Sequence, residues 1–94
     1  MDFTRRFRAN SSIMFKEEEE GAFLFDPETG NLKYANRSAR DAFLLLDGQM
    51  DISQVIDHLV GLYPDVDRKQ IQTDVESFLR ELVENRFISS CEGE

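Results

Sequence analysis

Short apolar runs alternate with polar, turn-forming residues between positions 12 and 35 of the chain. The first two runs are Ile13-Met14-Phe15 and residues 22–25, and the stretch Asp26-Pro27-Glu28-Thr29-Gly30 follows them. This stretch favours a turn, because proline fixes φ near a turn value and glycine adopts positive φ at no steric cost. Residues 31–35 then alternate between polar and apolar, which is typical of a strand with one buried and one wet face. The pattern predicts three consecutive antiparallel strands.

From residue 36 onward the apolar positions take helical spacing. Asn36 is a good N-cap for a first helix, which Asp47-Gly48 would end. A second helix is predicted from Asp51 to Tyr63, just before a proline. The third, over residues 67–85, has the clearest stripe, with apolar residues at i, i+4, i+7, i+8, i+11 and i+12: Ile71, Val75, Phe78, Leu79, Leu82 and Val83.

Three strands followed by three helices predict an α+β domain whose helices pack on one face of a small antiparallel sheet. The chain has 94 residues, which suits one domain. We expect residues 1–11 to form a flexible arm, docked only through Phe3 and Phe7. Residues 12–90 would form the domain, and residues 91–94 a polar tail.

The charge balance excludes several classes of function. The chain carries 19 acidic and 11 basic side chains, for a formal charge of −8. Nucleic-acid and anionic-membrane binding both depend on clustered Lys and Arg, so neither is expected. No apolar run approaches the length of a membrane-spanning helix. Because Cys91 is the only cysteine, no internal disulfide can form, and we interpret the protein as cytoplasmic.

The residues needed for catalysis or for a metal site do not occur in a convergent pattern. His58 is the only histidine, and no cysteine stands at ligand spacing from it. Cys91 has no local histidine to activate it, and the glycines are scattered rather than grouped in a phosphate loop. We therefore predict a non-catalytic protein without a cofactor. Residues Glu17 to Glu20 are interpreted as a solvated loop, or as acids that steer a basic partner.

The third predicted strand, residues 31–35, is the best candidate for a binding surface. It carries one charge and neither proline nor interior glycine, whereas glutamates follow the first strand and would blunt its edge. If it is the outer strand, an extended peptide can add to it through main-chain hydrogen bonds. The predicted contact residues are Leu32, Lys33, Tyr34 and Ala35, with the Lys33 N–H taken to point outward. The alternative is that Leu32 and Tyr34 belong to the core.

The third helix would form the other wall of such a groove. Ile71 and Val75, near its start, are predicted to contact the peptide, and Arg68 and Gln72 to give polar contacts at the groove mouth, as could Lys69. Phe78, Leu79 and Leu82 are expected in the core.

Several fragments, taken together in order and spacing, resemble the PqqD-like family, named for coenzyme PQQ synthesis protein D. They are Phe23 to Gly30, Asn36 to Ala39, Leu45 to Gly48, Ile56 to Tyr63, and Asp74 to Leu82. The resemblance implies a winged-helix-like fold and a peptide chaperone that binds the leader of a ribosomally made precursor peptide. It also implies delivery of that peptide to a modifying enzyme, often a radical SAM protein. Ala35 and Arg86 depart from the family pattern, which has leucine and glycine there, and PQQ synthesis is one possible pathway among several.

Two other functions stay open on the sequence. A winged-helix DNA-binding domain would use the second and third helices, although the third helix carries more acids than bases. A structural oligomerisation domain would pair two copies through the same open edge to form a homodimer.

Overall fold

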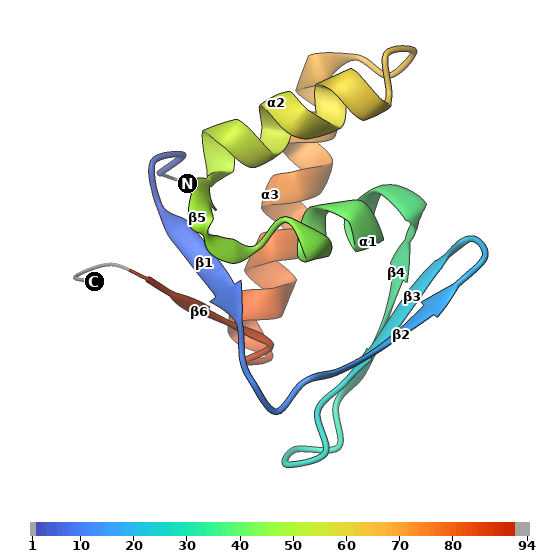
Figure 1. Cartoon of the computed structure of the whole chain (residues 1–94), viewed down its shortest axis with the longest axis vertical. Helices are drawn as coiled ribbons and strands as arrows, with labels where there is room; N and C mark the ends of the chain where they lie inside the picture. Colours follow the sequence, from blue (N-terminus) through green and yellow to red (C-terminus); the bar gives the residue numbers. More distant parts are fainter. Residues whose placement is uncertain (1, 92–94) are drawn as a thin grey trace.

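The computed structural model describes residues 2–91, which form two small antiparallel sheets and three helices. In chain order the elements are β1 (Arg6–Ala9), β2 (Met14–Glu18), β3 (Gly21–Phe25), β4 (Leu32–Asn36), α1 (Arg37–Leu44), β5 (Asp47–Asp51), α2 (Ile52–Leu62), α3 (Arg68–Glu84) and β6 (Ile88–Ser90). Figure 1 shows α3 in the middle of the molecule, with β1 and β6 on one side of it and the β2-β3-β4 sheet on the other. The predicted α+β class is confirmed, and the arrangement agrees with a winged-helix-like fold.

The predicted three-strand meander is present as the sheet β2-β3-β4, with β4 at one edge. Its second turn forms as the sequence indicates. Gly30 has φ +81°, and its N–H donates to the Asp26 carbonyl at 2.8 Å. The buried Asp26 carboxylate accepts from the Glu28 N–H at 2.9 Å, which closes the turn from inside.

The inward face of β4 is the opposite of the one that its apolar residues suggest. Leu32 and Tyr34 are 64% and 49% exposed, whereas Ala35 is fully buried and the Lys33 side chain is largely covered. Pairing sets this result, because Ala35 lies opposite Ala22 and Lys33 opposite Leu24, two residues of the core face of β3. The interpretation of Leu32 and Tyr34 as core residues is therefore wrong.

A second sheet, β5-β1-β6, replaces the predicted flexible arm. β1 pairs with strands on both sides, and Phe7 in its centre is only 3% exposed. The predicted tail also differs, since Cys91 is buried and its N–H donates to the Arg6 carbonyl at 2.9 Å, while residues 92–94 lie outside the described part. These strands have three to five residues each, and their partners are distant in sequence, so no local sequence pattern predicts them.

The helices begin where the sequence indicates. The Asn36 side chain accepts from the Ala39 N–H at 2.9 Å, and Asp51 forms a reciprocal capping box with Gln54. Asp67 occupies the N-cap position of α3 without a side-chain hydrogen bond. The stripe of α3 is buried at five of its six positions, and Val83 is the exposed one. None of the helices in residues 2–91 has the length and apolar character to cross a membrane.

The end of α3 departs from the usual chemistry of such a turn. The Phe87 N–H donates to the Leu82 carbonyl at 2.9 Å, and the Arg86 N–H to the Val83 carbonyl at 3.1 Å. This pair of bonds is the Schellman motif, in which the residue after the C-cap is usually glycine. Here that residue is Arg86, with φ 61°, where a Cβ is disfavoured. The motif turns the chain so that Phe87 and Ile88 enter the core.

Candidate peptide-binding groove

The free edge of β4 presents the main-chain groups of Leu32 and Tyr34. Paired residues in an antiparallel sheet alternate between those that exchange hydrogen bonds and those that do not. The Asp26 N–H donates to the Asn31 carbonyl, so Lys33 and Ala35, at the same phase of the ladder, also point their main-chain groups toward β3. In agreement, the Ala35 carbonyl oxygen lies 2.0 Å from where a Cβ on Gly21 would stand. The expectation that the Lys33 N–H points outward is therefore wrong.

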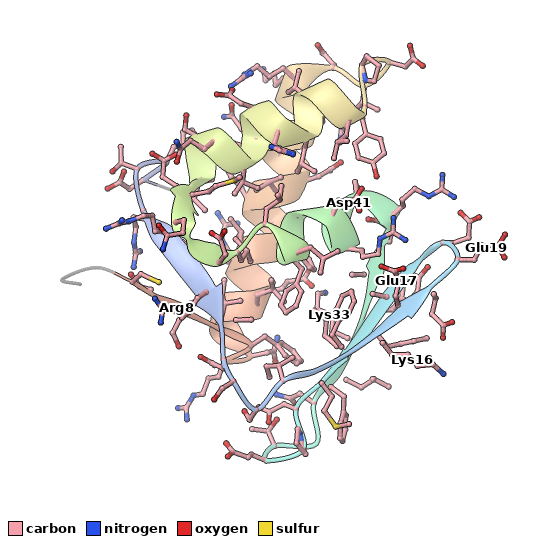
Figure 2. The ribbon with its side chains drawn as sticks, in the orientation of Figure 1. Arg8, Lys16, Glu17, Glu19, Lys33 and Asp41 are labelled. Carbon is pink, nitrogen blue, oxygen red and sulfur yellow. The ribbon has the colours of Figure 1, made fainter. Side chains whose placement is uncertain are left out.

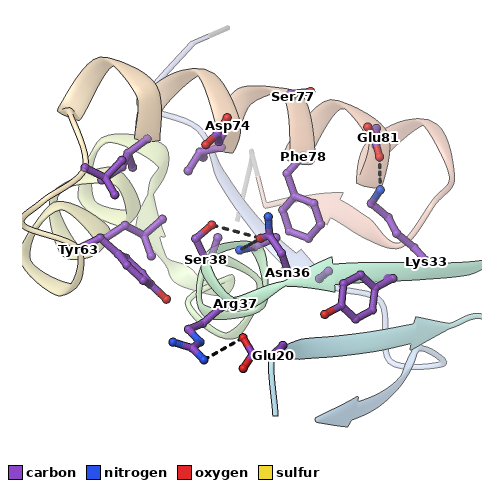
Figure 3. Close-up of a pocket in the computed structure, with 18 residues that line it drawn as sticks. Glu20, Lys33, Asn36, Arg37, Ser38, Tyr63, Asp74, Ser77, Phe78 and Glu81 are labelled. Carbon is purple, nitrogen blue, oxygen red and sulfur yellow. Dashed lines mark hydrogen bonds and ion pairs between the residues drawn. The ribbon is translucent and has the colours of Figure 1, made fainter. Parts of the chain in front are cut away.

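A groove of about 610 Å³ lies between β4 and α3. Its apolar lining combines small residues of β4 and α1 with larger ones of α2, α3 and the loop between them: Ala35, Ala39, Ala42, Leu59, Val66, Ile71, Val75 and Phe78. Figure 3 shows Asp74, Phe78 and Glu81 following one another along α3, with Phe78 and Glu81 projecting toward β4. The groove thus has an open strand along one wall and an apolar helix face along the other, the two features that an added strand needs.

Charged pairs stand at the borders of the groove. Lys33 of β4 forms an ion pair and hydrogen bond with Glu81 of α3, and its Nζ lies 5.7 Å from the centre of the Phe78 ring (Figure 3). Near the start of α1, an Arg37 guanidinium nitrogen lies 3.0 Å from a Glu20 carboxylate oxygen. Glu20, Asp74 and Glu81 give the lining three acids against the two bases Lys33 and Arg37. The borders therefore favour a peptide with some basic character.

A half-buried polar network fixes the end of the groove formed by Tyr63. The Tyr63 hydroxyl donates to the Asp41 carboxylate, which the Arg40 guanidinium approaches to 3.2 Å. Burial of the phenol raises the pKa of Tyr63 above its ordinary value, and the hydrogen bond to Asp41 raises it further. At neutral pH the Tyr63 hydroxyl therefore stays protonated and donates its hydrogen bond to Asp41, which links the end of α2 to α1.

Five of the eight predicted contact residues line the groove: Lys33, Tyr34, Ala35, Ile71 and Val75. The side chains of the other three lie elsewhere. Leu32 lines a hollow on the opposite face of the sheet, and Arg68 pairs with Asp57 of α2. Gln72 does not line the groove either. Which residues touch a peptide stays a prediction.

The sequence reasoning missed most of the helical wall. Asp74, Ser77 and Glu81 line the groove, and Phe78, expected only in the core, lines it while being buried. A signal was present, because positions 71, 74, 75, 78 and 81 follow the i, i+3, i+4, i+7 spacing of one helix face. His58 is exposed on α2, and no group of three metal-ligating side chains occurs within residues 2–91.

Comparison with known proteins decides the family. The sequence pattern of coenzyme PQQ synthesis protein D (PqqD) matches residues 21–88, which is more than half of the chain. The chain belongs to the PqqD family. The matched span runs from the start of β3 to the start of β6, so it contains both walls of the groove.

Two solved structures share the fold of this PqqD-family chain. TbiB1, in complex with the TbiA(beta) leader peptide, has a TM-score of 0.73 at 20% identity, covering 93% of this chain and 96% of that one. Lasso peptide synthetase B1, complexed with the leader peptide, has a TM-score of 0.74 at 23% identity, covering 89% and 98%. A search of curated proteins gives no match.

Proposed function

We propose that this protein is a non-catalytic peptide chaperone that binds the leader of a ribosomally made precursor peptide as an added strand beside β4. The observation that carries the proposal is the open edge of β4 next to an apolar groove. Two proteins of the same fold, at 20% and 23% identity, were solved with leader peptides, which supports the same ligand class here.

The chemistry of the groove suits a ligand recognised mainly through its backbone. The main-chain groups of Leu32 and Tyr34 offer affinity that is independent of peptide sequence. Alternate side chains of an added strand would point toward α3, where the wall is formed by Ile71, Val75 and Phe78. We expect apolar leader side chains at these positions, and a basic one near Asp74 or Glu81.

A module that only binds a leader needs an enzyme to act on the rest of the peptide. We propose that the chaperone presents its peptide to a modifying enzyme, such as a radical SAM protein, in the cytoplasm. The single cysteine, Cys91, is free and buried, which suits a reducing compartment. PQQ synthesis is one candidate pathway, and the synthesis of another modified peptide is the alternative.

The test is a titration of isotope-labelled protein with the leader of the precursor peptide encoded beside it, followed by amide chemical shifts. Shifts are expected at residues 32–35 and 71–78, on the two walls of the groove. Binding that moves only the amides of residues 17–20, or that moves none, would contradict the proposal.

A matched pair of variants separates the main-chain contact from the side chain. Tyr34→Ala removes the ring and keeps the N–H, whereas Tyr34→Pro removes both from an edge position where proline is tolerated. One lost hydrogen bond that leaves a peptide carbonyl unpaired costs about 1–3 kcal/mol. Tyr34→Pro should therefore bind the leader roughly 5- to 150-fold more weakly than Tyr34→Ala. Equal affinities would exclude strand addition at this position. Lys33→Pro is unsuitable, since it breaks the pairing of β4 with β3.

A further inference from the structure

The outer face of the β2-β3-β4 sheet, turned away from the helices, carries an apolar surface that the fold does not use. The register places Met14, Phe25 and Leu32 in one row across the three strands, and Lys16, Phe23 and Tyr34 in the next. Met14 and Leu32 are 60% and 64% exposed. We call these six residues the outer patch.

The outer patch is hollowed and ordered by its own contacts. A depression of about 380 Å³ is lined by Met14, Phe15, Lys16, Phe23, Phe25 and Leu32. The rings of Phe23 and Tyr34 meet edge to face, with centroids 5.2 Å apart. Antiparallel sheets with one solvated face normally alternate apolar and polar residues, so five apolar or aromatic side chains out of six on the wet face need a reason.

Packing in the core does not account for these side chains, because the core residues of the same strands lie on the opposite face of the sheet. Ala22, Leu24 and Ala35 point toward the helices and are fully buried. Figure 2 shows the alternation in β2, where Lys16 points away from the helices and Glu17 toward them. Exposed apolar surface that is not part of the core is typical of a docking site.

Charge at both ends of the sheet indicates what docks there. Residues 17–20, at and before the β2–β3 turn, are four glutamates. Within residues 2–91, Lys16 forms an ion pair with Glu18 and Arg37 with Glu20. The β3–β4 turn, residues 26–31, presents the exposed Glu28 and contains no base. Two copies packed face to face would bring an acidic turn against an acidic turn in either direction, and each copy has a formal charge of −8. The occupant is therefore a different protein, with basic side chains around an apolar centre.

We infer that the outer patch docks the enzyme that modifies the peptide, an inference that rests on the proposed function. The groove lies on the helix side of β4 and the outer patch on its other side, with Tyr34 at the border of both. Leader and enzyme can therefore bind at once, with one strand between them, and the enzyme receives the peptide without displacing it.

The experiment measures two affinities for each protein. One probe is the purified modifying enzyme encoded beside this chain, and the other is the synthetic leader. The test variant is Met14→Ser with Phe25→Ser, two paired outer-patch residues of β2 and β3 that do not line the groove. The control is Leu44→Ser with Leu62→Ser on α1 and α2, because both leucines are 54% exposed and lie outside the sheet. The test variant should bind the enzyme at least tenfold more weakly and the leader within twofold of the wild type. The control should change neither affinity.

Three results would overturn the inference. The first is an enzyme that binds the test variant as tightly as the wild type, or does not bind the wild type at all. The second is a wild type whose sedimentation shows a dimer that the test variant lacks, since a second copy would then occupy the patch. The third is leader affinity that falls together with enzyme affinity, because the two surfaces would then be one. Failure of the proposed function is seen separately, as absent leader binding by the wild type.

Discussion

Replacing Arg86 with glycine should stabilise the protein, because Arg86 occupies the left-handed position of the turn that ends α3. Its φ is 61°, and both hydrogen bonds of the Schellman motif are formed around it. A side chain with a Cβ costs about 1–2 kcal/mol in this conformation. Glycine removes that cost but gains about 0.5–1 kcal/mol of extra freedom in the unfolded chain. The expected net gain is about 0.5–1 kcal/mol in the free energy of unfolding.

The control for this change is Arg86→Ala, which removes the same guanidinium and keeps the Cβ. A gain of 0.5–1 kcal/mol corresponds to a rise of about 2–8 °C in Tm for a domain of this size. Urea denaturation should move the midpoint at constant slope, since the surface exposed on unfolding does not change. Arg86→Gly should exceed both Arg86→Ala and the wild type in stability. If the glycine and alanine variants are equally stable, the strain assigned to this turn is absent.

Three further changes test the sheet and the polar network. Gly30→Ala should lower the free energy of unfolding, measured by denaturation, by about 1 kcal/mol. The positive φ is the only cause of this loss, because nothing lies within 4 Å of the added Cβ. Gly21→Ala should lower the free energy of unfolding further, by about 2–3 kcal/mol, because its Cβ would stand 2.0 Å from the Ala35 carbonyl oxygen. Equal losses for the two variants would contradict the close approach of β3 and β4. Tyr63 has a raised pKa in the folded state, so its stabilisation is complete below about pH 10 and is lost as the pH rises from there. Tyr63→Phe should remove this alkaline loss when the unfolding free energies at pH 9 and pH 11 are compared, and an unchanged loss would refute the assignment.

The elements with strong local signals were predictable from the sequence. Asn36 and Asp51 cap their helices as their residue types indicate, and Gly30 adopts the positive φ that its turn requires. The stripe of α3 is long enough to specify both a helix and a buried face. In each case the deciding interaction joins residues within a few positions of one another, so the sequence contains both partners.

Strand β1 shows where that reasoning ends. It has four residues and is held by β5 and β6, which follow it by about 40 and 80 positions. Its pattern of one buried phenylalanine among polar neighbours does not differ from that of a loose arm. The stability of so short a strand comes from its neighbours on both sides, so the sheet becomes visible only when the chain has folded.

The alternation of residues 31–35 determined that β4 has two faces, and the turn chemistry determined that it pairs with β3. Neither feature of the sequence determined which face of β4 meets the helices or which of its main-chain groups remain free. The tertiary structure decided both through one register. In this register the main-chain groups of Lys33 and Ala35 point toward β3 and their side chains toward α3, while the side chains of Leu32 and Tyr34 are exposed. The physical reason is the period of two in a strand, because a shift of one residue exchanges both the side-chain faces and the free hydrogen-bonding groups.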